Sequence, residues 1–183
     1  MKTQTHAEFL KWYETIHEPF VRYCSSRAYG LIETEDLVQE TILATLKGFS
    51  RIQHKEKLLG FMIGVVNNLI KNKLRRKKFR GQWDEVLLEK LESRAPSPEV
   101  ALDIHYLLKA MEQLPARQKE ALILFEVSGF SLREVAEIQE SSVAAVKTRL
   151  HRSRQKLRTL LTDEGSTSTS VSARLAAYAS ILL

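Results

Sequence analysis

One stretch, residues 130–157, constrains the fold most strongly: FSLREVAEIQESSVAAVKTRLHRSRQKL. Ser131 is followed three residues later by Glu134, which is the pattern of a capping box and predicts that a helix begins there. Ser142 can cap a second helix after a short turn at 140–141. A short helix, a tight turn and a longer helix together have the geometry of a helix-turn-helix motif. This segment therefore predicts two helices with a defined turn between them.

The second of these helices has two different faces. Its apolar stripe consists of Val143, Val146, Leu150 and Leu157. The opposite face is basic and polar, with Lys147, Thr148, His151, Arg152, Gln155 and Arg158, and it is flanked by Arg149, Arg154 and Lys156. Such a helix fits the major groove of DNA, where polar side chains meet base edges and arginines meet phosphates. A basic helix can also be a solvated face, or a target for a membrane surface or calmodulin, but the capping box and the turn favour DNA.

Positive charge is concentrated in two segments. Residues 71–80 hold seven Lys or Arg and residues 147–158 hold six, and neither segment contains Asp or Glu. Between them, residues 81–99 carry five acidic and two basic side chains, with Pro96 and Pro98 separated by one serine. Proline disfavours helix in the residue before it, so this segment is typical of a linker. We expect two small basic modules joined by an acidic linker, and the net charge of +6 favours a polyanionic partner.

Apolar residues recur at helical spacing along the rest of the chain. The expected helices are one through Phe9, Tyr13, Ile16, Phe20 and Cys24, kinked at Pro19, and others at 34–46, 58–74, 100–114 and 121–127. The helix at 58–74 is apolar over a wide arc, so we expect it to be a buried central helix. No segment alternates apolar and polar residues as a half-buried strand would. The fold class is therefore all-α, with two small helical domains joined by a flexible linker.

Composition argues against several other classes of protein. Cys24 is the only cysteine and the five histidines are scattered, so we expect no disulfide framework, no metal site and no cofactor. The amino terminus lacks the apolar core of a signal peptide, and no apolar run approaches the roughly 20 residues of a membrane span. We therefore expect a cytoplasmic protein with no membrane insertion.

Four segments of the chain, two of which overlap residues 130–157, appear in a specific order. They are ETEDLVQETILATLKGF at 33–49, LGFMIGVVNNLIKNKLRRKK at 59–78, LPARQKEALILFEVSGFSLREVAEI at 114–138 and VAAVKTRLHRSRQKL at 143–157. With this order and spacing, over residues 7–161, the chain closely resembles an extracytoplasmic-function (ECF) sigma factor, the minimal two-domain branch of the main bacterial sigma family. The resemblance implies a region 2-like domain at 7–80, an acidic linker at 81–99, a region 4-like domain at 100–162 and a C-terminal tail at 163–183.

The resemblance also implies roles for particular residues. The segment matching EDLVQET would contact the clamp helices of the largest subunit of core RNA polymerase, through Asp36, Leu37, Gln39 and Glu40. The segment matching GFMIGVVNNLIKNKLRRKK would bind the −10 promoter element, through Asn68, Lys71, Arg75 and Arg76. The polar face of the last helix would bind the −35 element, through Lys147, Thr148, Arg149, His151 and Arg152. Leu122, Leu124 and Phe125 would pack the second module or meet the flap of the second-largest subunit.

Each of these roles has a plainer alternative. The acidic side chains at 35–40 could simply be solvated, and Asn68 could cap or bridge helices instead of donating to and accepting from a base edge. Apolar residues at helical spacing, as at 122–125, are more often core than contact surface. The loop at 49–57 is where the family forms its pocket for a flipped base, but its residues cannot be assigned individually.

The second module departs from the family pattern at its turn. The usual turn glycine is Glu140 here, and the apolar residues around it are Gln139 and Ser141. A left-handed conformation at Glu140 would carry a strain of about 1–2 kcal/mol. The Gly-Thr that usually opens the recognition helix is replaced by Ala144-Ala145, which removes one hydroxyl contact to phosphate.

The tail, residues 163–183, lies beyond the resemblance. It begins with a Ser/Thr run typical of a linker, and then Val171, Leu175, Tyr178 and Leu182 would share one face of a short helix. We expect this tail to fray, and the alternative is that it folds back to cover one of the modules.

Three classes of function fit the chain. The first is a non-catalytic sigma factor that binds core RNA polymerase and promoter DNA, usually with an anti-sigma factor as a further partner. The second is a helix-turn-helix transcriptional regulator that acts without core polymerase. The third is an enzyme acting on nucleic acid, but no glycine-rich phosphate loop, metal-ligand set or nucleophile–base pair is evident. The module at 33–78 favours the sigma factor, because a simple regulator does not need it.

Overall fold

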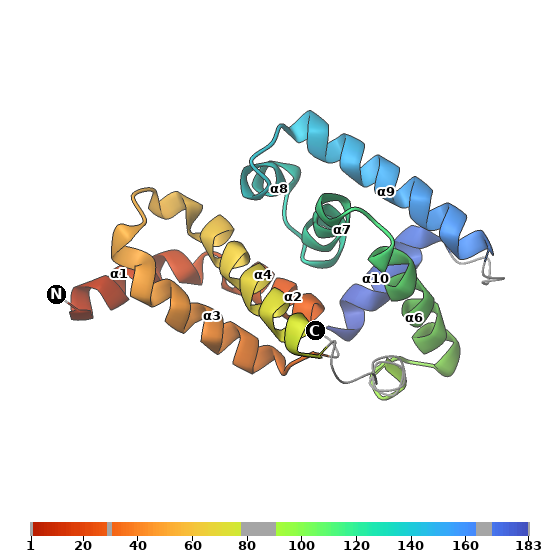
Figure 1. Ribbon diagram of the computed structural model, residues 1–183, viewed down its shortest axis with the longest axis horizontal. Helices are drawn as coiled ribbons and strands as arrows, with labels where there is room; N and C mark the ends of the chain where they lie inside the picture. Colours follow the sequence, from red (N-terminus) through yellow and green to blue (C-terminus); the bar gives the residue numbers. More distant parts are fainter. Residues whose placement is uncertain (1, 29–30, 78–90, 164–169, 183) are drawn as a thin grey trace. The chain divides into compact units, whose positions relative to one another are not determined.

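The chain forms two compact units, Met1–Gly81 and Gln82–Leu183 (Figure 1). The computed structural model describes residues 2–28, 31–77, 91–163 and 170–182. Within these ranges every regular element is a helix, which confirms the all-α fold class. Residues 78–90 lie outside the described part, and they include the end of the first basic segment and most of the acidic linker.

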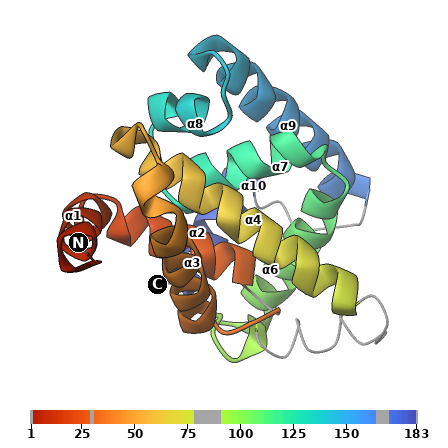
Figure 2. The same cartoon turned by 60° about the vertical axis from the view of Figure 1, so that its left-hand side comes forward.

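The first unit is a small helical bundle. Its elements are α1 (Lys2–Glu14), α2 (His17–Ala28), α3 (Thr34–Gly48), the 3-10 turns η1 (Phe49–Arg51) and η2 (Lys55–Lys57), and α4 (Leu58–Lys77). Helices α2, α3 and α4 all pack against one another, and Figure 2 shows them side by side. The core at the α1 end is aromatic: the ring of Phe9 stacks on Tyr13 and meets the edge of Phe49, with both centroid separations 5.5 Å.

The helix expected to be kinked at Pro19 is two helices. The chain leaves α1 after Glu14 and enters α2 at His17, so the break precedes the proline. Pro19 lies in the first turn of α2, where a backbone N–H has no intrahelical acceptor and its absence is tolerated. The prediction of a kink at Pro19 was therefore wrong.

Helix α4 is buried on one side only. Met62, Val66 and Ile70 are at most 2 % exposed, because α2 and α3 pack against that side. Phe61 and Leu74 remain 41 % and 40 % exposed. The expected buried central helix is therefore confirmed on the side that packs against α2 and α3, whereas the wide apolar arc extends beyond the surface that these two helices cover.

The second unit carries the helix-turn-helix. Its elements are α6 (Pro98–Glu112), α7 (Ala116–Leu122), the π-helical turn η3 (Ile123–Val127), α8 (Leu132–Ile138), α9 (Val143–Asp163) and α10 (Val171–Ile181). The Oγ atom of Ser97 accepts a hydrogen bond from the backbone N–H of Val100 at 3.4 Å, and Pro98 occupies the first turn of α6. The second proline of the expected linker therefore starts a helix.

The C-terminal segment folds back rather than fraying. Helix α10 packs against α6 and η3, and Figure 1 shows it running beside α6. Val171, Leu175 and Tyr178, which share one face as expected, are buried, and so is Leu182 just after the helix. The favoured expectation of a frayed tail was wrong, and the alternative, folding back onto a module, describes the structure.

Candidate nucleic-acid interface

The start of each helix in the helix-turn-helix is fixed by a side-chain cap. The backbone N–H of Ser131 donates to Glu134 Oε2 at 2.8 Å, and the N–H of Glu134 donates to Ser131 Oγ at 3.3 Å. This reciprocal pair is the capping box predicted from the sequence. The N–H of Ala145 donates to Ser142 Oγ at 3.1 Å, as expected for the cap of α9.

The turn between α8 and α9 closes through a left-handed residue. Glu140 has a φ of 46°, and its N–H donates to the carbonyl of Glu137 at 3.1 Å. The N–H of Ser141 reaches back to the carbonyl of Ala136 at 2.9 Å. These two bonds form a Schellman motif, in which the left-handed position is usually glycine. Glu140 does adopt the left-handed conformation whose strain was considered from the sequence, and it carries that strain.

A buried amide beside this turn links three elements. Gln139 is 5 % exposed, and its Nε2 donates to the carbonyl of Arg117 at 3.0 Å and to Glu120 Oε2 at 3.3 Å, both on α7. Its Oε1 accepts from Arg149 Nη1 of α9 at 2.9 Å, and the same nitrogen donates to Ser141 Oγ at 2.7 Å. The network holds α7, the turn and α9 together. The sequence signal that could have found it is a glutamine where the family has an apolar residue.

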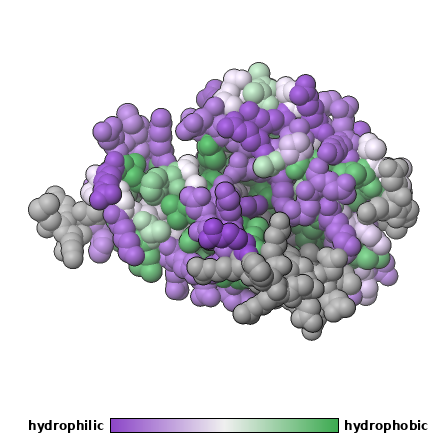
Figure 3. Space-filling view, in the orientation of Figure 1, coloured by the Kyte–Doolittle hydropathy of each residue, from purple (hydrophilic) through white to green (hydrophobic). Residues whose placement is uncertain are grey.

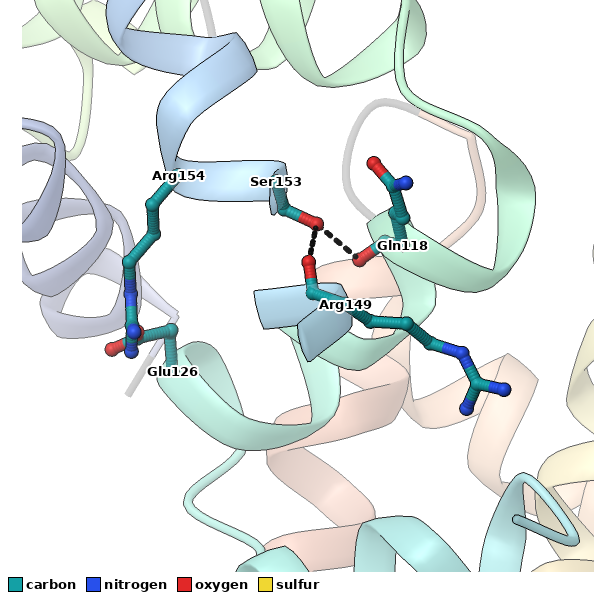
Figure 4. A network of polar contacts seen from close by, with 5 residues as sticks. All are labelled: Gln118, Glu126, Arg149, Ser153 and Arg154. Carbon is teal, nitrogen blue, oxygen red and sulfur yellow. Dashed lines mark hydrogen bonds and ion pairs between the residues drawn. The ribbon is translucent and has the colours of Figure 1, made fainter. Parts of the chain in front are cut away.

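Further polar contacts hold α9 against α7 and η3 (Figure 4). The Ser153 hydroxyl lies between two carbonyls, at 2.7 Å from that of Arg149 and 3.4 Å from that of Gln118. Arg154 donates through Nε to Glu126 Oε1 at 2.8 Å and forms an ion pair with it. Lys156 Nζ donates to the carbonyl of Gln113 at 2.8 Å. Three basic side chains of α9 therefore have partners inside the unit, Arg149, Arg154 and Lys156, which fixes the position of the helix.

The polar face of α9 is exposed as expected. Val146, Leu150 and Leu157 are at most 2 % exposed and attach the helix to the unit. The exposed side chains on the other side are Lys147, Thr148, His151, Arg152, Gln155 and Arg158. The remaining candidate for −35 binding, Arg149, is half-buried because it is bonded to the turn. The outer face thus presents hydrogen-bond donors and positive charge of the kind that duplex DNA attracts.

A second polar face lies on α4. Asn68, Lys71 and Arg75 are exposed at helical spacing, and exposed Phe61 lies two turns before Asn68 on the same side. The neighbouring residue, Asn67, bridges helices instead: its Oδ1 accepts from Tyr23 Oη at 3.0 Å and from Arg27 Nη2 at 3.3 Å. The bridging alternative considered for Asn68 therefore applies to Asn67. The backbone of Arg76 belongs to α4, but its side chain lies outside the described part.

The third candidate surface is the outer side of α3. Asp36, Gln39 and Glu40 are exposed there, and Glu40 Oε1 accepts from Lys73 Nζ of α4 at 3.1 Å. Leu37 is 0 % exposed and packs in the core, so its predicted surface contact with polymerase was wrong. Leu43, which sequence reasoning did not select, is 60 % exposed and lies one turn beyond Glu40 and Gln39.

Large exposed hydrophobic side chains are few among the described residues. They are Leu10, Trp12, Leu43, Phe61, Leu74 and Leu102. The face seen in Figure 3 is mostly hydrophilic, with smaller hydrophobic patches between the polar side chains. Leu43 and Phe61 stand out because each lies on a polar face of the first unit. An apolar side chain inside a polar face is a common anchor of protein and nucleic-acid contacts.

In the described ranges no group of three or more His, Cys, Asp or Glu side chains could hold a metal ion. No helix in the described part of the chain is long and apolar enough to cross a bilayer.

Comparisons with known proteins agree with this arrangement. The family model for sigma-70 region 2 matches residues 12–80, and that for sigma-70 region 4 matches residues 104–157. The ECF RNA polymerase sigma factor EcfG of Rhodopseudomonas palustris is 31% identical over 132 residues, which are 72% of this chain and 73% of EcfG. The ECF sigma factor SigD of Mycobacterium tuberculosis is 31% identical over 155 residues, covering 79% of this chain and 73% of SigD.

Two further similarities extend over most of the chain. The RNA polymerase sigma factor SigV of Bacillus subtilis is 28% identical over 164 residues, covering 89% of this chain and 97% of SigV. The solved structure of CnrH in complex with the cytosolic domain of CnrY matches with a TM-score of 0.56 at 19% identity, covering 89% of this chain and 96% of CnrH, which supports the fold. Two matched sigma-70 regions in order, together with relatives above 30% identity, show that the chain belongs to the ECF RNA polymerase sigma factors, which direct transcription initiation.

Proposed function

We propose that each exposed polar face has its own partner: α9 binds the −35 element, α4 binds the −10 element, and α3 binds core RNA polymerase. The observation that carries the proposal is the face of α9, where Lys147, His151 and Arg152 are exposed on a helix whose start and position are fixed. Thr148 lies on the same face, and its hydroxyl donates to the carbonyl of Ala144 at 3.0 Å. Arg149 would contribute mainly by holding the turn, with its remaining donors directed to phosphate.

The −10 contact is proposed for the exposed side of α4. Lys71 and Arg75 would hold the backbone of a separated DNA strand, and Asn68 would bond a base edge. Phe61, exposed on the same side, adds an aromatic surface of the kind on which single-stranded bases stack. Arg76 stays in the proposed set on the strength of the sequence resemblance.

The polymerase contact is proposed for the outer side of α3. Asp36, Gln39 and Glu40 offer acidic and amide groups to the clamp helices of the largest subunit, and Leu43 offers an apolar anchor among them. In the second unit Leu122 and Leu124 are 0 % exposed and belong to the core, which leaves partly exposed Phe125 as the candidate for contact with the polymerase flap.

Three broader parts of the proposal complete this picture. We propose that the protein acts in the cytoplasm, that it has no catalytic activity of its own, and that an anti-sigma factor restrains it. The solved complex of CnrH with the cytosolic domain of CnrY supports the last point, since a chain of the same fold binds a second protein there.

The test is binding to purified bacterial core RNA polymerase, followed by run-off transcription of genomic DNA. We expect stable core binding and new start sites, whose upstream sequences align into two promoter elements. Replacing Lys147 and Arg152 by alanine together should reduce run-off transcripts by about tenfold or more while core binding stays intact, because one good contact to a base edge is worth about 1–3 kcal/mol. Lys11→Ala, which removes one exposed lysine of α1, is the control and should change neither readout.

The opposite results separate the alternatives. Duplex DNA binding without core binding would favour a helix-turn-helix regulator. Loss of core binding in the Lys147 and Arg152 double variant would mean that the polymerase contact lies on α9.

A further inference from the structure

Gly64 lies in the interior of α4, on its exposed side. It is exposed itself, and it follows Phe61 by three positions and precedes Asn68 by four, so all three residues share one face of the helix. Apart from proline, glycine is the least favourable residue inside a helix, because it loses more backbone entropy on folding than any other residue. A glycine at this position therefore calls for a physical explanation.

Packing within the protein does not supply that explanation. Apart from the two chain neighbours and the backbone of α4 itself, no atom of the described structure lies within 4 Å of the place where a Cβ of residue 64 would be. At Gly48, by contrast, a Cβ would lie 3.6 Å from Cζ of Phe61. An alanine at position 64 would therefore fit the described fold without a clash, and it would favour the helix.

The space above Gly64 is bounded along the helix by an aromatic ring and an amide. Phe61 is 41 % exposed, and its ring lies next to Gly48 at the end of α3. Asn68 is exposed on the other side of Gly64, and its amide leans back toward Gly64 because the side chains of a helix point toward its amino end. We call the surface without a side chain at residue 64, between Phe61 and Asn68, the Gly64 gap.

We propose that the Gly64 gap receives one unstacked base of the separated promoter strand, with the base ring against Phe61 and its edge at the amide of Asn68. This inference rests on the −10 contact proposed for α4, and it adds Gly64 as the residue that decides whether a base reaches the helix. Phe61 and Asn68 are about 10 Å apart along the helix axis, which accommodates a base about 3.4 Å thick. A long side chain at position 64 would fill the same space.

The charge of this face indicates that the occupant is nucleic acid. Helix α4 contains no Asp or Glu, and Lys71 and Arg75 are exposed on the face that carries Gly64. Cations that follow the strand, next to an exposed aromatic ring on which a base stacks, are the combination by which proteins bind single-stranded DNA. An acidic protein segment would meet the same cations, and the binding of core polymerase by the variants below tests that occupant.

The experiment compares the full chain with Gly64→Ala and Gly64→Gln, each assembled with core polymerase. Alanine and glutamine both favour helix over glycine, so hydrogen exchange in α4 should slow by about three- to fivefold. The template is a promoter mapped by the run-off experiment, with its −10 region left unpaired. Binding of the holoenzyme to this template should fall by at least about tenfold for Gly64→Gln and by less for Gly64→Ala.

The opposite signs of the two readouts separate a binding role from a structural one. A tenfold loss is about 1.4 kcal/mol, which lies in the range typical of one base stacked on an aromatic side chain. Damage to the fold would speed hydrogen exchange in α4, whereas filling the Gly64 gap weakens the promoter complex while the helix becomes more stable.

Asn72→Ala is the matched control. Asn72 is exposed on the same helix, one turn beyond Asn68, and alanine raises the helix propensity there without adding atoms to the Gly64 gap. Hydrogen exchange in α4 should slow again, whereas binding of the unpaired template should stay within about twofold of the wild type. Core binding should be the same for all three variants.

Three results would overturn the proposal. One is unchanged binding of the unpaired template by Gly64→Gln, and wild-type start sites in the same series would then leave the proposed function intact. Another is loss of core binding in Gly64→Gln, which would assign the Gly64 gap to polymerase instead of DNA. The third is an equal loss of template binding in Asn72→Ala, because a more rigid α4 would then be the cause.

Discussion

Replacing Gln139 should loosen the recognition helix more than a surface substitution would. Its side chain makes three hydrogen bonds, to the carbonyl of Arg117, to the carboxylate of Glu120 and from the guanidinium of Arg149. A net contribution of about 1 kcal/mol for the neutral bond and about 1.5–3 kcal/mol for each charged one is typical. Because Glu120 and Arg149 are only half-buried, water replaces part of what they lose. For Gln139→Ala we expect a loss of about 2–4 kcal/mol.

The assay is hydrogen exchange of the backbone amides of α9 in the full chain, which reports on the second unit without interference from the first. A loss of about 2–4 kcal/mol corresponds to a fall in protection of about 30- to 700-fold, since 1.4 kcal/mol is a factor of ten. Gln139→Leu fills most of the same volume and removes only the polar contacts, so its effect should be smaller. Glu140→Gly is the control of opposite sign in the same turn, because glycine adopts the left-handed conformation freely and should raise protection by up to about tenfold.

The reasoning would be refuted if Gln139→Ala lowered the protection of α9 by less than about threefold. The polar network would then be a consequence of the packing of α7 on α9 and not one of its causes. A fall in protection for Glu140→Gly would equally contradict the claim that the left-handed glutamate is strained.

Three other predictions concern the remaining surfaces and the core. The double variant Asp36→Ala with Gln39→Ala should weaken binding to core polymerase by about tenfold in a pull-down titration, and so should Leu43→Ala alone. Leu37→Ala should instead lower the free energy of unfolding of the first unit by about 2–5 kcal/mol. Equal core binding by all of these variants would contradict the α3 assignment. The separate second unit should bind duplex DNA weakly, with log affinity falling steeply as log salt concentration rises, and salt-independent binding would contradict phosphate contacts. Burial raises the pKa of the Cys24 thiol from 9.0 to about 12, so the folded state favours the neutral thiol. The contribution of this group to the free energy of unfolding is therefore fully present below pH 9 and is lost as the pH rises toward 12. In Cys24→Ala, unfolding followed by circular dichroism should depend less on pH in this range.

The parts of the fold that the sequence predicts well are those set by neighbouring residues. Ser131 and Glu134 form their capping box within four residues, and Ser142 caps α9 in the same local way. The exposure of the outer face of α9 follows from the helical period of its apolar residues alone. Once the apolar stripe is buried, Lys147 and Arg152 on the opposite side of the helix must face solvent. The left-handed conformation of Glu140 is local in the same sense, since the turn must close whichever residue occupies that position.

What the sequence could not predict depends on which neighbour covers which arc of a helix. Leu37 and Leu43 are both leucines of α3, yet one is fully buried and the other is 60 % exposed. Likewise, Phe61 and Met62 are adjacent in the apolar arc of α4, and only Met62 is buried. Periodicity gives the direction of a side chain from its own helix axis, but the width of the covered surface is set by the other helices. The exposure of the polar side chains was therefore predicted correctly, whereas that of Leu43 and Phe61 among them was not.

The tail shows the same limit at the level of a whole helix. An isolated helix of 11 residues is unstable, so local reasoning about 171–181 predicts fraying. Its stability comes from a distant surface on α6 and η3 and from an ion pair of Arg174 with Asp103, which lies 71 positions earlier in the sequence. Nothing in the tail itself specifies that surface. A helix that is ordered only by contact with a distant surface therefore cannot be recognised from its own residues.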